Sequence, residues 1–273
     1  MALTRPILWI LALLAALLAS PAAAHQLSPD ELHQVGFRQR QGDTLPLDLQ
    51  FTDESGQRVT LSDYFGSSRP VILTLNYFHC QNLCPLELQG LIDGLNGVPF
   101  TLGDQYTLLT VSFDTRDTPW DATTARFRAL RGYTHPEAAS GWHVLTSTQQ
   151  SVIDKLTQAV GFEYIYDSQE DEFAHPAGVV IVTPSGQISR YIYGLDFSAN
   201  DVRLGLVEAV ARRIGSLAEQ VLLICYHYDP ISGRYTPLVF NILGIAAAAT
   251  VVVVAVGLLF LFRADLPKAR DTR

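Results

Sequence analysis

Cysteine is scarce in this chain, with three residues among 273. So few cysteines exclude a disulfide framework of the kind that holds small exported domains together. Positive charge is also in deficit, because 19 lysines and arginines face 27 acidic residues, for a net charge of -8. This balance argues against a nucleic acid as partner, since binding to phosphates needs a basic surface. The sequence also has no phosphate-binding glycine loop, serine triad or paired-carboxylate motif.

Two of the three cysteines stand together in the segment Cys80-x-x-x-Cys84-Pro85. It follows an apolar, β-prone run at residues 71–78, and a helical pattern begins at the proline. Proline suits the first turn of a helix, so the sequence places Cys84 near the N-cap, where backbone N–H groups stabilise a thiolate.

This spacing allows the two sulfurs of Cys80 and Cys84 to meet at one point. Two chemistries fit: a reversible disulfide, or a pair of thiolate ligands to a soft metal, either Cu(I) or Zn(II). A purely structural disulfide is the third interpretation. It is disfavoured because closing a three-residue loop removes little entropy from the unfolded chain.

The N-terminal residues 1–24 have the pattern of a secretory signal peptide. Arg5 precedes an apolar run at 7–18, and small residues lead to a cleavage position after Ala24. The apolar run is too short for a comfortable membrane span. The sequence therefore predicts export of the remaining chain.

The C-terminal part contains a long run without charge at residues 237–262. At a rise of about 1.5 Å per residue it exceeds the ~30 Å hydrocarbon core, which predicts a transmembrane helix. Lysine and arginine follow in the tail 263–273, and the positive-inside rule places that tail in the cytoplasm. We expect a single-pass protein of the cell membrane with its domain on the periplasmic side.

Strand and helix patterns alternate between these ends. Residues 25–45 are expected to form a leader, 46–224 the folded domain, and 225–236 a juxtamembrane linker. We expect a hairpin at 49–61, strands at 71–78, 106–113, 142–145, 178–183 and 187–193, and helices at 85–97, 119–131, 149–160 and 199–223. This order predicts an α/β fold with a mostly parallel central sheet flanked by helices and an antiparallel edge.

Several segments in this order resemble the SCO/SenC family, the thioredoxin-fold copper chaperones for cytochrome c oxidase assembly. The resemblance covers about residues 45 to 215. The motifs are the hairpin before the central strand, the cysteine segment, Ser112-Phe-Asp114-x-x-Asp117-Thr-Pro119, and the distant His175.

The resemblance implies a thioredoxin-like fold and one copper ion, Cu(I) or Cu(II), bound by Cys80, Cys84 and His175. It also implies a client, the copper centre of a cytochrome oxidase or of another copper-dependent respiratory enzyme. This chain differs from the familiar members, which usually have an N-terminal membrane anchor, because its predicted span is C-terminal.

Other polar residues have more than one interpretation. Asp114 and Asp117 either orient the loop at the site or dock a partner, or they form an Asx-type turn that caps the next helix. His79 should point to the face opposite Cys80, which favours a packing or tuning role over ligation.

A second group, Cys225, His227 and Asp229, stands just before the predicted span. It offers a soft, an intermediate and a hard metal ligand within five residues. We consider two interpretations: a second, transient copper site at the membrane surface, or an unpaired thiol in a linker.

The sequence leaves two main functions open. One is a copper-binding assembly factor; the other is a thiol–disulfide oxidoreductase in which Cys80 and Cys84 keep the client's cysteines reduced, with a thiol reductant protein as partner. His175 separates them, because a reductase needs no histidine ligand. A peroxidase is disfavoured, since no activating arginine or threonine stands in the cysteine turn. A closed zinc site is disfavoured because three ligands leave it incomplete.

Overall fold

The computed structural model describes residues 28, 33–80, 83–211, 228–229, 234–235, 250 and 254. The chain divides into two units, Met1–Ile214 and Gly215–Arg273. In the second unit, β12 (Tyr228–Asp229) and β13 (Arg234–Tyr235) form an antiparallel pair. The first unit contains the folded domain that carries the candidate site.

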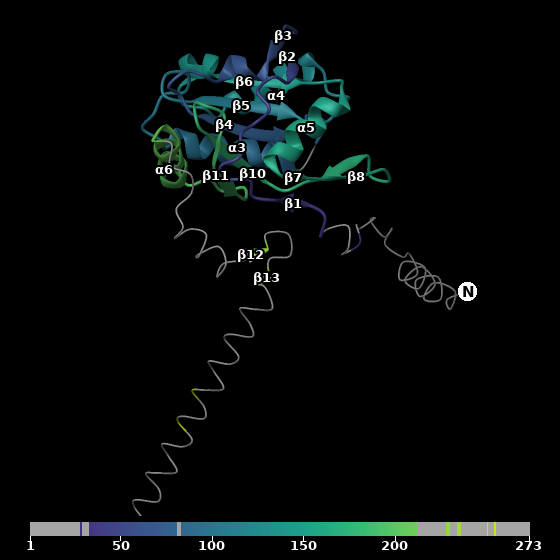
Figure 1. The fold of residues 1–273 in the computed structure, drawn as a ribbon, viewed down its shortest axis with the longest axis vertical. Helices are drawn as coiled ribbons and strands as arrows, with labels where there is room; N and C mark the ends of the chain where they lie inside the picture. Colours follow the sequence, from purple (N-terminus) through teal and green to yellow (C-terminus); the bar gives the residue numbers. More distant parts are fainter. Residues whose placement is uncertain are drawn as a thin grey trace, which may run out of the picture. The chain divides into compact units, whose positions relative to one another are not determined.

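A seven-stranded sheet forms the centre of this domain, in the order β11-β10-β4-β5-β6-β2-β3 (Figure 1). Its strands are β2 (Gln50–Asp53), β3 (Arg58–Thr60), β4 (Val71–Asn76), β5 (Thr107–Ser112), β6 (Trp142–Thr146), β10 (Gly178–Val182) and β11 (Ile188–Tyr193). Only the neighbours β4–β5 and β5–β6 are parallel. The remaining pairs are antiparallel.

The sheet is therefore mixed, and the prediction of a mostly parallel sheet is wrong. The cause lies at its two edges. The first hairpin, β2–β3, adds to β6 antiparallel, and the last hairpin, β10–β11, adds to β4 antiparallel. Only the middle of the sheet is built by β–helix–β crossovers, which impose parallel pairing.

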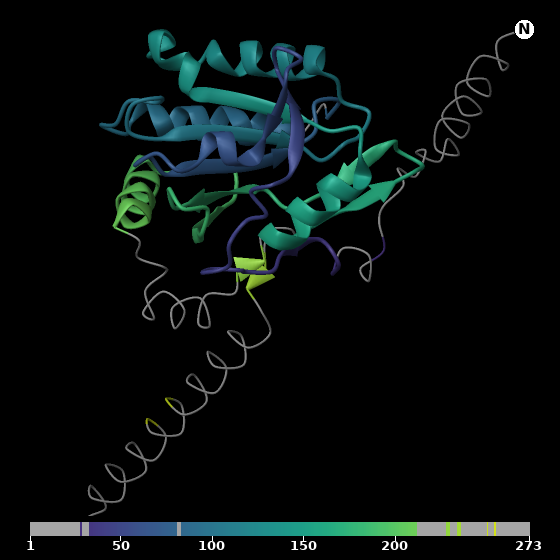
Figure 2. The ribbon, with the colours of Figure 1, turned by 45° about the horizontal axis from the view of Figure 1, so that its top comes forward.

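Four helices of the described chain cover the two faces of the sheet (Figure 2): α3 (Leu83–Asn96), α4 (Pro119–Leu130), α5 (Gln150–Val160) and α6 (Ala199–Val210). Successive side chains of a strand point to opposite faces. In β4, Ile72 packs in the cluster with α3, α4 and α6, while Leu73 packs in the cluster with α5. Two 3-10 helices, η1 (Leu61–Tyr64) and η2 (Pro136–Gly141), complete these layers.

In the first unit, two short strand pairs lie outside the main sheet. The first joins β1 (Gly36–Phe37) to β7 (Phe162–Glu163), so part of the stretch expected to be an irregular leader pairs with the domain. The second is a hairpin of β8 (Ile165–Asp167) and β9 (Glu172–Ala174), which projects from the main sheet in Figures 1 and 2. This hairpin leads directly to His175.

Helix α3 begins at Leu83, so Cys84 lies in its first turn, close to the helix start as the sequence predicts. One helix boundary differs from the expectation. Helix α6 ends at Val210 with Ala211 as its C-cap, and the rest of the expected helix lies outside the described residues.

The predicted signal peptide at 1–24 also lies outside the described residues, and so does the predicted span at 237–262 apart from Thr250 and Val254. Within the described part of the chain, no helix has the length and apolar character needed to cross a membrane.

Candidate metal centre

The two cysteines lie at the carboxyl end of β4, where the sequence places them. Cys80 ends the turn that follows the strand, and Cys84 belongs to the first turn of α3. Both are free thiols and both are buried, with 8% and 3% of their surface exposed. The backbone N–H of Cys84 donates to Sγ of Cys80 over 3.4 Å, so the helix start supports this sulfur.

His175 approaches this pair from the other side. It follows β9 and is itself buried. Its Nε2 lies 3.2 Å from Sγ of Cys84, and its Nδ1 lies 3.1 Å from the carbonyl oxygen of Pro176. A proton on Nδ1 that is donated to this carbonyl leaves the Nε2 lone pair facing the sulfurs, which is the usual tautomer of a ligating histidine.

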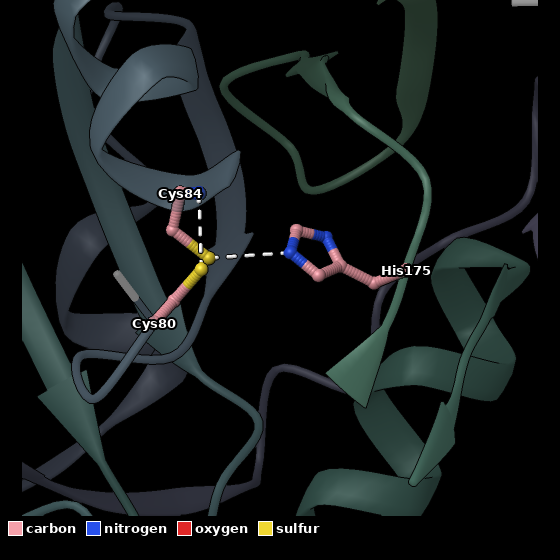
Figure 3. A group of neighbouring side chains, drawn as sticks. All are labelled: Cys80, Cys84 and His175. Atoms are coloured by element: carbon pink, nitrogen blue, oxygen red, sulfur yellow. Dashed lines mark hydrogen bonds between the residues drawn. The ribbon is translucent and has the colours of Figure 1, made fainter. Parts of the chain in front are cut away.

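The three donor atoms therefore converge. The two Sγ atoms and the imidazole nitrogen lie within 4.8 Å of one another, and Figure 3 shows the imidazole pointing at the two sulfurs. The structure thus brings together the three residues that the family resemblance implies as copper ligands. Two thiols and one imidazole form a soft donor set that fits Cu(I).

Aromatic side chains surround the imidazole. Its ring centre lies 5.9 Å from that of Tyr77, 5.3 Å from Phe113 and 6.0 Å from Phe162. Phe173 packs against both Tyr77 and Phe113. These rings keep water from the donors and limit the orientations that the imidazole can adopt.

The two thiols differ strongly in acidity. The hydrogen bond from Cys84 is the main cause that lowers the pKa of Cys80 to about 3, and His175, the Cys84 backbone N–H and Tyr77 add to it against the opposing effect of burial. Burial first, and then the neighbouring Cys80, raise the pKa of Cys84 above its ordinary value. The reduced pair therefore holds one thiolate and one thiol at neutral pH.

Asp117 connects two loops beside the site. Its carboxylate accepts from the backbone N–H of Phe78 over 2.8 Å and from Oγ of Ser112 over 2.6 Å. It also lies 2.6 Å from Nδ1 of His79, whose side chain is 56% exposed. Asp117 thus orients the turn that leads to Cys80, which agrees with the interpretation that it orients the loop at the site.

The alternative was an Asx-type turn that caps the next helix, and the structure shows this turn at Asp114 but a different residue as the cap. Helix α4 is capped by Thr118, which forms a reciprocal capping box with Asp121. Asp114 accepts from the backbone N–H of Arg116 over 2.9 Å and from Nε of the same arginine. Because this guanidinium neutralises Asp114, the group of His79, Asp114 and Asp117 is a poor cation site, although its ligand atoms lie close together.

Two residues near the site are not indicated by any motif in the sequence. Glu87 is 1% exposed and neither carboxyl oxygen has a hydrogen-bond partner. Burial raises its pKa well above the usual range; the nearby Gly178 N–H opposes this without forming a hydrogen bond of normal geometry, and the charge of Cys80 adds to it. The helical period could have revealed Glu87, because it lies one turn after Cys84 beside Leu88 and Leu91 on the buried face. Arg116 is the second, and no local pattern reveals its partners.

The second group of possible metal ligands, Cys225, His227 and Asp229, lies mostly outside the residues that the structure describes. Cys225 and His227 lie outside the described residues. Asp229 ends β12, and its side chain is not described. The prediction of a second copper site therefore stays a prediction.

A family model described as SCO1/SenC matches residues 38–209, well over half of the chain. No curated protein sequence matches it. Among solved structures, two proteins of Aquifex aeolicus VF5, provisionally assigned to electron transfer and electron transport, are each 26% identical. The first has a TM-score of 0.55, and the alignment covers 63% of this chain and 95% of that protein. The second has a TM-score of 0.52, and the alignment covers 63% of this chain and 99% of that protein. Arabidopsis thaliana ScoI with copper bound is 19% identical, with a TM-score of 0.48, and aligns over 60% of this chain and 96% of its own.

Proposed function

Since the chain belongs to the SCO1/SenC family, we propose that it binds copper through Cys80, Cys84 and His175 and delivers it to a respiratory oxidase. The observation that carries the proposal is the convergence of these three donor atoms within 4.8 Å. The donors come from two segments that are far apart in the chain. A disulfide alone would need no imidazole at this point.

The donor set suits copper in its reduced state. Two thiolates and one neutral imidazole complete a three-coordinate Cu(I) site. The helix start and the buried surroundings favour a compact, low-charge complex, since two thiolates and Cu(I) carry one net negative charge. Transfer to a client then proceeds by ligand exchange, in which the client's donors replace these ligands one at a time.

The same pair also supports the alternative function, a thiol–disulfide oxidoreductase that keeps the client's copper-binding cysteines reduced. The observation in its favour is the Cys80 thiolate, with a pKa of about 3. A thiolate attacks a disulfide, and Cys84 would resolve the mixed disulfide by forming the Cys80–Cys84 bond. A thiol reductant protein would then have to restore the pair.

Copper stoichiometry on the full-length, detergent-solubilised and fully reduced protein tests the first function. We expect one tightly bound Cu(I) in the wild type and its loss in His175→Ala, with the copper retained in Cys225→Ser. Absence of tight copper in the wild type, together with a readily reduced Cys80–Cys84 disulfide, would favour the oxidoreductase. A second copper that disappears in Cys225→Ser would support a site with Cys225, His227 and Asp229.

Membrane attachment belongs to the same proposal. The uncharged run at 237–262, followed by basic residues at 263–273, supports a single span with the domain on the periplasmic side. A chain ending at residue 230 should leave the membrane fraction, while the full chain should require detergent for extraction. Extraction of the full chain by carbonate alone would contradict this topology.

A further inference from the structure

We propose that Arg116 and Asp171 form a latch that holds the β8–β9 hairpin in place and so positions His175 over the cysteine pair. This inference rests on the proposed copper function. Neither residue touches the donor atoms, so both act through the hairpin that ends one residue before the histidine.

The hairpin lies outside the main sheet, so side-chain contacts connect it to the rest of the domain. Its strands pair only with each other among the described strands, at Ile165–Ala174, Tyr166–Phe173 and Asp167–Glu172. On its inner side, the backbone N–H of Phe173 donates to the hydroxyl of Tyr77 over 3.3 Å, and the two rings pack edge to face. An isolated two-stranded hairpin is marginally stable, so contacts with the rest of the domain determine where it lies.

Arg116 provides such a contact from the loop after β5. Its guanidinium is anchored by Asp114, which is buried and receives Nε at 2.9 Å and the second terminal nitrogen at 2.8 Å. From this anchor the other terminal nitrogen reaches Oδ1 of Asp171 over 2.5 Å. The guanidinium also covers the rings of Tyr166 and Phe173, at 5.4 and 5.7 Å from their centres. One side chain thus contacts both strands and the turn.

Asp171 lies in the turn of the hairpin in a left-handed conformation. It is the one non-glycine residue with positive φ, 54°, among the residues that the structure describes. Aspartate adopts this conformation more readily than most residues, because its short side chain can form local hydrogen bonds. Here the carboxylate accepts from the hydroxyl of Tyr166 over 2.6 Å as well as from Arg116. The turn is therefore held in one conformation by its own side chain.

The latch should control position more than overall stability. Its outer half is open to solvent, because the side chain of Arg116 is 44% exposed and that of Asp171 is 69% exposed. Ion pairs with this exposure contribute little to the free energy of unfolding. A hairpin released from Arg116 would instead allow His175 to move away from Sγ of Cys84, which lies 3.2 Å from its Nε2.

The primary test is Asp171→Asn in the full-length protein, measured as Cu(I) affinity by competition with a chelator. Asparagine tolerates positive φ, so this change removes the charge and leaves the turn conformation. Removing a residue that hydrogen-bonds directly to a metal ligand typically weakens metal binding about 10–100-fold. Asp171 acts on His175 only through the backbone of the hairpin, so we expect a smaller loss of Cu(I) affinity, about 3–10-fold. The matched control is Glu170→Gln, which removes an equal charge from the same turn and should leave the affinity unchanged.

A double-mutant cycle with His175→Ala separates positioning from a general charge effect. If the latch acts through His175, Asp171→Asn should weaken tight copper binding when His175 is present. It should have no effect on the weaker residual binding by Cys80 and Cys84 that is measured in the His175→Ala background. Tyr166→Phe, which removes one of the two groups bound to Asp171, should show a smaller loss with the same dependence on His175.

Equal affinity of Asp171→Asn and wild type would overturn the latch and leave the proposed function intact. An equal loss in Glu170→Gln, or in the His175→Ala background, would also overturn the latch, because the effect would then be one of charge alone. A wild type without tight copper would overturn the proposed function and the latch together.

Discussion

The two sulfurs at the site are chemically unequal before any metal arrives. Cys80 lies in the turn before α3, and the hydrogen bond from Cys84 is the main cause that lowers the pKa of its thiol to about 3. Burial raises the pKa of Cys84 instead. Of the two sulfur ligands of the proposed copper site, Cys80 is therefore already deprotonated at pH 7, and Cys84 keeps its proton until the metal displaces it.

This inequality predicts the number of protons released on copper binding. Because only Cys84 still carries a proton, about one proton per Cu(I) should be released at pH 7, whereas two ordinary thiols would release nearly two. Calorimetry in buffers of different ionisation enthalpy measures this number. A value near two would show that Cys80 is protonated in the reduced protein and that the hydrogen bonds at its sulfur are weaker than the geometry indicates.

The pH dependence of alkylation is a second prediction for Cys80. Its folded pKa is lowered, so the thiolate is present above about pH 3 and is lost only below it. The alkylation rate at this residue, located by mass spectrometry, should stay nearly constant from pH 8 down to pH 5, while an ordinary thiol slows about tenfold per pH unit below pH 8. Cys84→Ala removes the largest cause of the shift and should restore a steep dependence.

Helix α3 lies unusually close to the segment that precedes α6, and two of its glycines allow this. A Cβ at Gly90 would meet the backbone oxygen of Leu195 at 1.8 Å, and one at Gly94 would meet that of Phe197 at 2.2 Å. Neither oxygen can be displaced without moving backbone. The small residues therefore set how closely the helix that carries Cys84 packs against the domain.

Gly90→Ala should accordingly destabilise the protein in spite of the higher helix propensity of alanine. Overpacking typically costs about 1–3 kcal/mol of unfolding free energy, against a gain of about 1 kcal/mol in propensity. Thermal or urea unfolding measures the balance. Gly36→Ala is the matched control, since a Cβ there meets nothing within 4 Å, and it should unfold like the wild type.

The elements show which features a sequence pattern can predict. The hairpin β2–β3, the strands β4 and β5 and the capped start of α4 are confirmed, because each combines an apolar run with a local turn or cap signal. The β8–β9 hairpin gave no such signal. Its strands have only three residues each, and they are held by contacts with Arg116 and Tyr77, which lie far away in the chain. Strand direction at the sheet edges also depends on distant pairing.

The site follows the same division. The cysteines were identifiable because they are rare and adjacent, and His175 was identifiable only through the family resemblance. The residues next to a lone histidine in the sequence do not indicate which distant loop it contacts in the folded domain. Arg116 looked like an ordinary surface arginine for the same reason, since its role depends on Asp171 being brought beside it in the folded domain.

For the whole molecule, copper should act as a folding ligand. Cys80 and Cys84 follow β4, whereas His175 precedes β10, about 90 residues later in the chain. The unfolded chain therefore has no comparable site. Free Cu(I), held by a buffering chelator at about 1,000 times the dissociation constant, should add about 4 kcal/mol to the unfolding free energy, or roughly 8–16 °C in Tm for a domain of this size. Differential scanning fluorimetry measures the shift. His175→Ala should lose most of it, and a fully oxidised Cys80–Cys84 pair should show none.

The separation of 91 residues between Cys84 and His175 has a consequence in time. Synthesis proceeds from the N-terminus, so every new molecule has both thiols before it has the histidine. During that interval the pair lacks its third donor and the rings of Phe162 and Phe173 that enclose it, and it is open to oxidants. A disulfide that formed between Cys80 and Cys84 before His175 joined them would leave a chain that cannot bind copper. A reductant that acts on newly made chains would preserve the two thiols until the site is complete.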